Sequence, residues 1–149
     1  MRMKDIAEIM TYSETTEADL IAADLITVSL GQNDRGYALG TIGDAPSNSG
    51  TSFYAATKWL CEYLLNLNPI ATIAFITPTP AVGFEAALRL RAKAIIEVCE
   101  LYSIPVLDLN KMSGFNSFSF DTYLDDTTHP NLLGYKRMAN ITASFLEQL

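Results

Sequence analysis

Short apolar segments rich in β-branched residues alternate with longer segments of helical periodicity, and this alternation most constrains the fold. The segments Ala23 to Leu30, Ala71 to Thr77 and Val106 to Leu109 have the length and composition of buried strands. Between them, helices are predicted from Ser52 to Asn68 and from Phe84 to Tyr102. Strands that are apolar on both faces and separated by helices indicate a parallel sheet covered on both sides. The predicted fold class is therefore α/β, in a single domain of residues 1–149.

Two further helices are predicted at the ends of the chain. Met3 to Met10 has apolar residues at the spacing of one helical face, and Asn131 to Leu149 is interpreted as a closing helix. Cys61 and Cys99 are interpreted as buried helix residues, because their spacing fits neither a disulfide framework nor a zinc site. No metal and no cofactor are expected.

The charge of the chain restricts its partners. A formal net charge of −7 argues against nucleic acid and anionic membranes, since both require a basic face. No apolar run reaches the roughly 18 residues of a membrane span, and the first ten residues lack the apolar core of a secretory signal. We therefore expect a soluble, cytoplasmic protein that binds a small neutral or weakly charged molecule.

Two polar motifs follow predicted strands. Gln32-Asn33-Asp34 comes directly after the first strand, and Asp126-Thr127-Thr128-His129 follows the last one. In open parallel sheets, ligands bind beyond the carboxyl ends of the strands, where loops gather. Both motifs are therefore expected at the same rim of the sheet.

The second motif contains the only histidine of the chain, His129, three residues after Asp126. Each motif has an ordinary structural interpretation, because Asn and Asp are common in turns and a histidine before proline can lie on a surface loop. The chemical interpretation is that Asp126 accepts the Nδ1 proton of His129 and leaves Nε2 free as a base. Asn33 would then donate an amide hydrogen to a developing oxyanion.

A family resemblance follows from four stretches: LITVSLGQND, YALGTIGD, IIEVCELYSIPVLDL and DDTTHPNLLGYKRMA. They resemble the later blocks of the SGNH hydrolases, also called GDSL-type esterases or lipases, from about Ala18 to the C-terminus. The resemblance implies a flavodoxin-like three-layer α/β/α sandwich that hydrolyses carboxylic esters, including acetylated sugars and lipids, without a metal. It assigns Gly31 and Asn33 to the oxyanion block, His129 as the catalytic base and Asp126 as its orienting carboxylate.

The sequence departs from this family in two blocks. The Gly-Asp-Ser motif of the nucleophile, which follows the first strand, does not occur, and neither does the block with the oxyanion-hole glycine. A leading strand and crossover of roughly 30 residues are thus expected to be missing. Gly43-Asp44-Ala45 has alanine at the serine position and lies in a loop. Ser29 lies in a strand and Ser52 is predicted to cap a helix, so neither is a good substitute.

Two hypotheses remain. The first is a truncated or split serine esterase that is inactive alone because its serine is absent. The second is a non-catalytic ligand-binding or interaction module derived from such an enzyme. In the sheet order usual for the family, 2-1-3-4-5, the third strand pairs with the first, which carries the serine. The resemblance therefore implies that the strand Asp24 to Leu30 lacks this neighbour and has an unpaired edge, with neither charge nor proline between Leu25 and Leu30. The chain is therefore expected to form a homo-oligomer or to pair there with a missing N-terminal segment.

Overall fold

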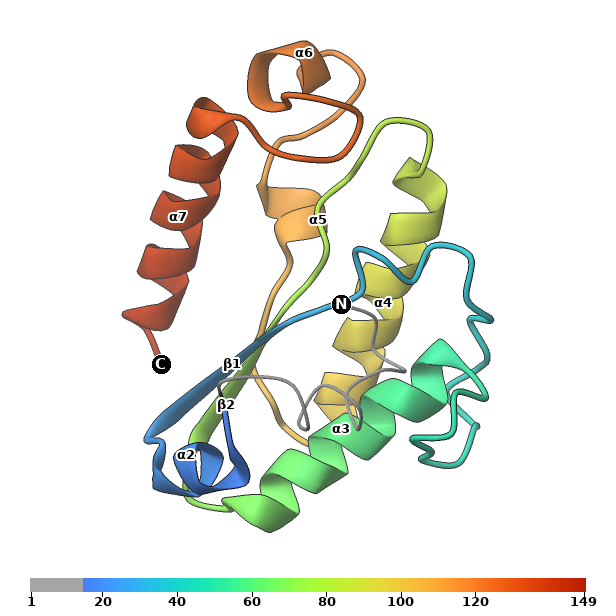
Figure 1. Ribbon diagram of the computed structural model, residues 1–149, viewed down its shortest axis with the longest axis vertical. Helices are drawn as coiled ribbons and strands as arrows, with labels where there is room; N and C mark the ends of the chain where they lie inside the picture. Colours follow the sequence, from blue (N-terminus) through green and yellow to red (C-terminus); the bar gives the residue numbers. More distant parts are fainter. Residues whose placement is uncertain (1–14) are drawn as a thin grey trace.

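The structure is a computed structural model that describes residues 15–149. In this part of the chain, β1 (Leu25–Ser29), β2 (Thr72–Ile76) and β3 (Val106–Leu107) form a parallel sheet in the order β1-β2-β3. Helix α3 (Phe53–Leu67) connects β1 to β2, and α4 (Glu85–Leu101) connects β2 to β3 (Figure 1). Parallel neighbours need such crossovers because each chain must return to the start of the sheet. The predicted α/β fold with a parallel sheet is confirmed.

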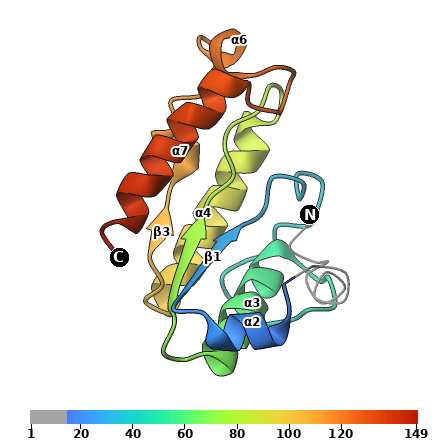
Figure 2. The same ribbon diagram turned by 60° about the vertical axis from the view of Figure 1, so that its left-hand side comes forward.

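The elements form three layers. Helices α3 and α4 cover one face of the sheet, and α7 (Leu132–Leu146) lies over the other (Figures 1 and 2). The larger core lies between the sheet and the helices α3 and α4. It includes Phe53, Leu60, Phe75, Ile95 and Val98. A smaller apolar cluster lies under α7 and consists of Ile76, Leu107 and Leu109 with Met138, Ile141 and Phe145.

Helix α3 begins and ends as the sequence predicts. The Ser52 hydroxyl accepts a hydrogen bond from the Ala55 backbone N–H at 3.1 Å, so Ser52 is the N-cap. At the other end, the Asn68 amide donates to the carbonyl oxygens of Leu20, Ile21 and Ala23. These bonds fix the segment before β1 against the end of α3.

The structure differs from the predicted elements at several points. The helix predicted at Met3 to Met10 lies outside the described residues. Helix α2 (Glu17–Ala22) was not predicted, although Thr16 and Asp19 form a capping box at its start. The predicted strand Val106 to Leu109 ends at Leu107, because Asp108 caps the short helix α5 (Leu109–Met112). Helix α6 (Phe120–Tyr123) was not predicted either and lies between α5 and the closing helix.

Strand β1 is covered on one face only. Ile26 and Val28 are buried against the helices, whereas Leu25, Thr27 and Ser29 are exposed, with Leu25 at 43%. The apolar cluster under α7 contains residues of β2 and β3 but none of β1. The prediction that every strand is covered on both faces is therefore wrong for β1 within residues 15–149. Within residues 15–149, β1 is an edge strand that pairs only with β2.

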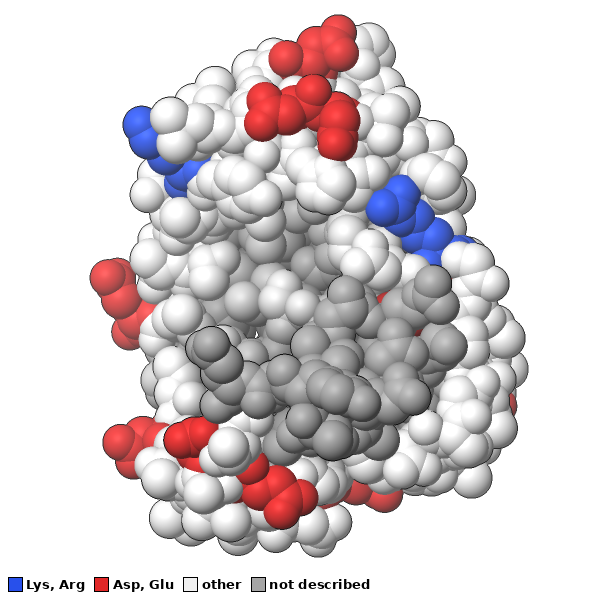
Figure 3. All heavy atoms as spheres, in the orientation of Figure 1, with Lys and Arg blue, Asp and Glu red and all other residues white. Residues whose placement is uncertain are grey.

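The surface agrees with the expectation of an acidic molecule. On the face shown in Figure 3, acidic side chains gather at the top, over α6 and the loop that follows it, and few basic side chains are visible. Asp121, Asp125 and Asp126 are exposed in this region. None of the helices within residues 15–149 is long and apolar enough to cross a membrane.

Candidate active site

Asp126 and His129 form a direct side-chain pair. His129 Nδ1 lies 2.7 Å from Asp126 Oδ2, in the loop between α6 and α7. An ionised carboxylate can only accept, so Nδ1 carries a proton and donates a hydrogen bond to Asp126. The ring is thereby oriented, and in the neutral imidazole this tautomer leaves Nε2 free to act as a base.

The backbone of the same loop makes this pairing a local property of the sequence. Asp126 Oδ1 accepts hydrogen bonds from the backbone N–H groups of Thr128 at 2.6 Å and His129 at 2.7 Å. An Asp that bonds to the backbone two and three residues ahead closes a tight turn. One carboxylate therefore holds both the backbone and the ring of His129.

These bonds lower the pKa of Asp126 from its ordinary value of 3.8 to about 2. The largest cause is the backbone N–H of His129, followed by the His129 ring and the backbone N–H of Thr128. Each donor stabilises the ionised form of the carboxylate. Asp126 therefore stays charged throughout the pH range in which a histidine base works.

Three contacts hold the loop in place. The Asp125 N–H donates to the His129 carbonyl at 2.8 Å, and the Val82 N–H donates to the Thr127 carbonyl at 2.8 Å. The Arg35 guanidinium donates to Thr128 Oγ1 at 3.3 Å. The last contact joins the histidine loop to the turn after β1, since Arg35 also donates to the Gln32 carbonyl at 2.9 Å.

The turn after β1 begins at Gly31, whose φ of +101° lies in the region that favours glycine. A Cβ at this position would lie 3.3 Å from the ring of Phe53, so the turn packs closely on α3. Gly31 is buried, and Gln32 and Asn33 follow it at the rim of the sheet. The arrangement explains why a glycine stands at this point of the motif.

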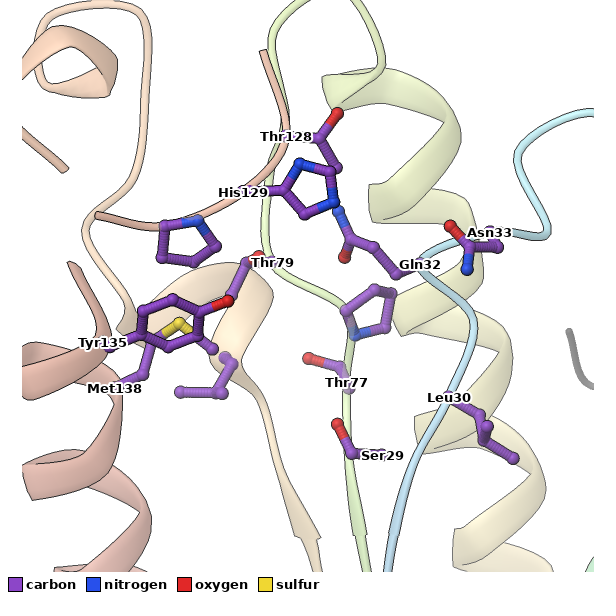
Figure 4. A pocket seen from close by; sticks show the side chains of 13 residues that line it. Ser29, Leu30, Gln32, Asn33, Thr77, Thr79, Thr128, His129, Tyr135 and Met138 are labelled. Atoms are coloured by element: carbon purple, nitrogen blue, oxygen red, sulfur yellow. The ribbon is translucent and has the colours of Figure 1, made fainter. Parts of the chain in front are cut away.

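A pocket of about 290 Å³ unites the two motifs (Figure 4). Its polar lining includes Gln32, Asn33 and His129. Its apolar lining includes Leu109 and, from α7, Tyr135 and Met138. The prediction that the two motifs share a rim is confirmed, because both contribute to one pocket. Gln32, Tyr135 and Met138 were not predicted as lining residues.

The described serines do not complete a triad. Ser29 ends β1 and lines the pocket, but in Figure 4 it lies well away from His129 and makes no hydrogen bond to it within residues 15–149. Asp44 of the Gly43-Asp44-Ala45 stretch accepts hydrogen bonds from Thr41 at 2.9 Å and from Ser52 at 2.5 Å. That stretch is a structural turn before α3, as its position in the sequence indicated.

Comparison with known proteins shows which family these features belong to. The pattern of the GDSL-like lipase/acylhydrolase family matches residues 6–137. The chain belongs to this family. No curated protein is similar enough to match, whereas solved structures of GDSL-like proteins do match.

Three solved structures illustrate the likeness in fold. A Lactobacillus plantarum protein is 28% identical with a TM-score of 0.76, over 93% of this chain and 71% of that chain. The lipase/acylhydrolase of Enterococcus faecalis is 15% identical with a TM-score of 0.67, over 99% and 71%. A catalytic mutant of an acetylxylan esterase from Geobacillus stearothermophilus is 15% identical with a TM-score of 0.65, over 95% and 66%. The last two show the fold alone.

The chain is shorter than its structural neighbours. It spans 65% of the length of another solved structure to which it is 29% identical, and 53% of a GDSL-like protein of Bacteroides uniformis. The fold is thus shared over most of this chain, but over only part of each of these two neighbours.

Proposed function

We propose that this chain is the histidine-bearing part of a serine esterase of the GDSL family. One observation carries the proposal: His129, which Asp126 holds at 2.7 Å, lines the same pocket as Asn33. Base, orienting carboxylate and oxyanion donor are the parts of a serine hydrolase site that stand around the nucleophile.

The proposed reaction assigns one role to each group. A serine hydroxyl attacks the ester carbonyl while His129 Nε2 takes its proton, and Asn33 donates to the oxygen that becomes negative. His129 then returns the proton to the leaving alcohol, and an acyl-enzyme remains. Water, deprotonated by the same imidazole, hydrolyses the acyl-enzyme to the carboxylic acid and frees the serine.

The pocket lining supports an uncharged ester as substrate. Within the described part of the chain, no Lys, Arg, Asp or Glu side chain contributes to the lining. Gln32 and His129 lie together on one side, and Tyr135 and Met138 lie across from them (Figure 4). Leu109 adds further apolar surface to the lining. A neutral carbonyl compound with a short apolar acyl group matches both parts.

The serine would come from a strand that pairs with the free edge of β1. In the sheet order expected for the family, this neighbour carries the nucleophile. Within residues 15–149 that edge has no partner, and the apolar side chain of Leu25 is exposed beside it. Unpaired, uncharged edges recruit other strands. When the serine-bearing segment is absent, a second copy of this chain would take the edge.

Joining the chain to its serine-bearing segment tests the proposal. The DNA upstream of Met1 is translated in three frames, and a strand followed by Gly-Asp-Ser is joined to the chain or expressed beside it. The complex should hydrolyse p-nitrophenyl acetate, and His129→Ala should lower its kcat by about 10⁴ to 10⁶. A folded complex without activity, or one indifferent to His129→Ala, would contradict the proposal. If no such segment exists, a non-catalytic module becomes the better explanation.

The chain alone provides the matching control. It should hydrolyse p-nitrophenyl acetate no faster than its His129→Ala variant. A burst that depends on His129 and disappears in Ser29→Ala would instead assign the nucleophile to Ser29. Sedimentation of the same sample tests the edge of β1, since a folded monomer at micromolar concentration would count against strand recruitment.

A further inference from the structure

Gln32 carries a polar atom that its surroundings do not satisfy. Its Nε2 atom is buried and has no hydrogen-bond partner within residues 15–149. Its backbone is fixed, because Arg35 donates to the Gln32 carbonyl at 2.9 Å and the preceding Gly31 is packed against Phe53. A buried donor without an acceptor destabilises the folded protein, so such groups are usually completed by a ligand or water.

The free amide belongs to the pocket. Gln32 and His129 both line it, and in Figure 4 the Gln32 side chain extends from the turn toward the His129 ring. Gln32 and Asn33 supply the only side-chain NH₂ groups among the described lining residues. With no lysine or arginine in that lining, these two amides are the side-chain nitrogen donors that an acyl oxygen would meet.

We infer that the side-chain amide of Gln32 binds the acyl oxygen of the substrate, next to Asn33. This inference rests on the proposed esterase function. In the ester, Nε2 donates to the carbonyl oxygen, and after hydrolysis it donates to the carboxylate of the product. Gln32 is thus a second amide donor beside the one that the family resemblance assigns.

Binding of a product carboxylate tests the inference on the chain as it exists. The isotope-labelled protein is titrated with sodium butyrate, against sodium chloride at equal ionic strength, and the side-chain NH₂ signals are followed by NMR. The chain has two glutamines, and the other, Gln148, donates to the Ser144 carbonyl at 2.8 Å and serves as internal control. The Gln32 signals should shift and saturate while those of Gln148 stay fixed.

Two variants sharpen the result. Gln32→Met keeps the length of the side chain but removes the donor, and should weaken butyrate binding about tenfold or more, since the lost bond is to a charged group. Gln32→Asn keeps an amide on a shorter side chain. Its affinity for butyrate should lie between those of the wild type and Gln32→Met.

The signals of Gln32 and Asn33 separate this inference from the proposed function. Gln32 signals that stay fixed while those of Asn33 and His129 shift would overturn the inference and leave the esterase proposal standing. Fixed signals at all three residues would overturn the inference as well, and would count separately against the oxyanion role of Asn33. Saturable shifts at Gln32 in the wild type, together with weaker butyrate binding by Gln32→Met, support it.

Discussion

Replacing Arg91 by methionine should destabilise the molecule by releasing the turn that carries the site. Arg91 lies on α4 and is only 4% exposed. Its Nε atom donates to the Asp34 carbonyl at 3.0 Å, and its Nη2 atom donates to the Tyr37 carbonyl. Its guanidinium carbon lies 5.3 Å from the centre of the Phe53 ring. Burial lowers the pKa of Arg91, and the nearby Asp34 opposes this effect.

The magnitude follows from what the substitution leaves behind. Two carbonyl oxygens lose a charged donor, which costs about 1–3 kcal/mol for each acceptor left unsatisfied. Asp34, which is fully buried, loses the positive charge of Arg91. For the two acceptors together this amounts to about 2–6 kcal/mol, and we expect a loss of that size in the free energy of unfolding. Such a loss is a large part of a typical total of about 5–15 kcal/mol.

Urea unfolding followed by fluorescence measures this change. Trp59 is the only tryptophan, and it stacks on Tyr63 with a centroid distance of 5.2 Å, so its emission reports on α3. Arg89→Met is the matched control, because Arg89 is exposed on the same helix. The control should change stability by less than about 0.5 kcal/mol. An Arg91→Met protein within about 1 kcal/mol of the wild type would refute the argument that this cation supports the turn.

Three further outcomes are expected. Gly134→Ala should lower the unfolding free energy by about 1–3 kcal/mol, because the new Cβ overlaps the Tyr123 carbonyl and lies 3.0 Å from Pro130; an unchanged urea midpoint would disprove the overlap. Gly31→Ala should cost about 1–2 kcal/mol through its positive φ, whereas Gly36→Ala, which meets nothing within 4 Å, should be neutral in the same assay. The Asp126 carboxyl should titrate near pH 2 by ¹³C NMR. Since its pKa is lowered by folding, its stabilising effect is complete above pH 3.8 and is lost as the pH falls from there toward 2. His129→Ala should leave much of this shift, because the backbone N–H is its largest cause, and a wild-type midpoint above 3.5 would contradict the assignment.

Local sequence signals predicted the α/β fold and the pairing of Asp126 with His129. The Ser52 cap and the apolar face of α3 are properties of consecutive residues, and so is the Asp126–His129 pair, which needs only a spacing of three. The extent of β3 was overestimated because Asp108 was interpreted as part of a strand when its side chain caps the next helix. At this position the capping bond to the Lys111 backbone outweighs the β-propensity of the neighbouring residues.

The remaining features depend on contacts between distant parts of the chain. Arg35 and Thr128 are 93 positions apart, and no local pattern predicts that they touch. Gln32 looked like an ordinary turn residue, because its unsatisfied amide becomes visible only when the surrounding elements are in place. One face of β1 is exposed because α7 packs over β2 and β3 and not over β1, and the sequence of the strand alone does not predict where α7 packs.

The two cysteines make the opening of the helical layer measurable by thiol alkylation. Cys61 on α3 and Cys99 on α4 are fully buried, and the hydrogen bond that the Cys99 thiol donates to Cys61, together with burial, raises the pKa of Cys99. Because both sulfurs are buried, alkylating reagents cannot reach them while the helices stay packed. The rate of alkylation under native conditions therefore counts how often α3 and α4 separate. Because alkylation is covalent, a molecule in which this layer has opened once stays labelled after the layer closes.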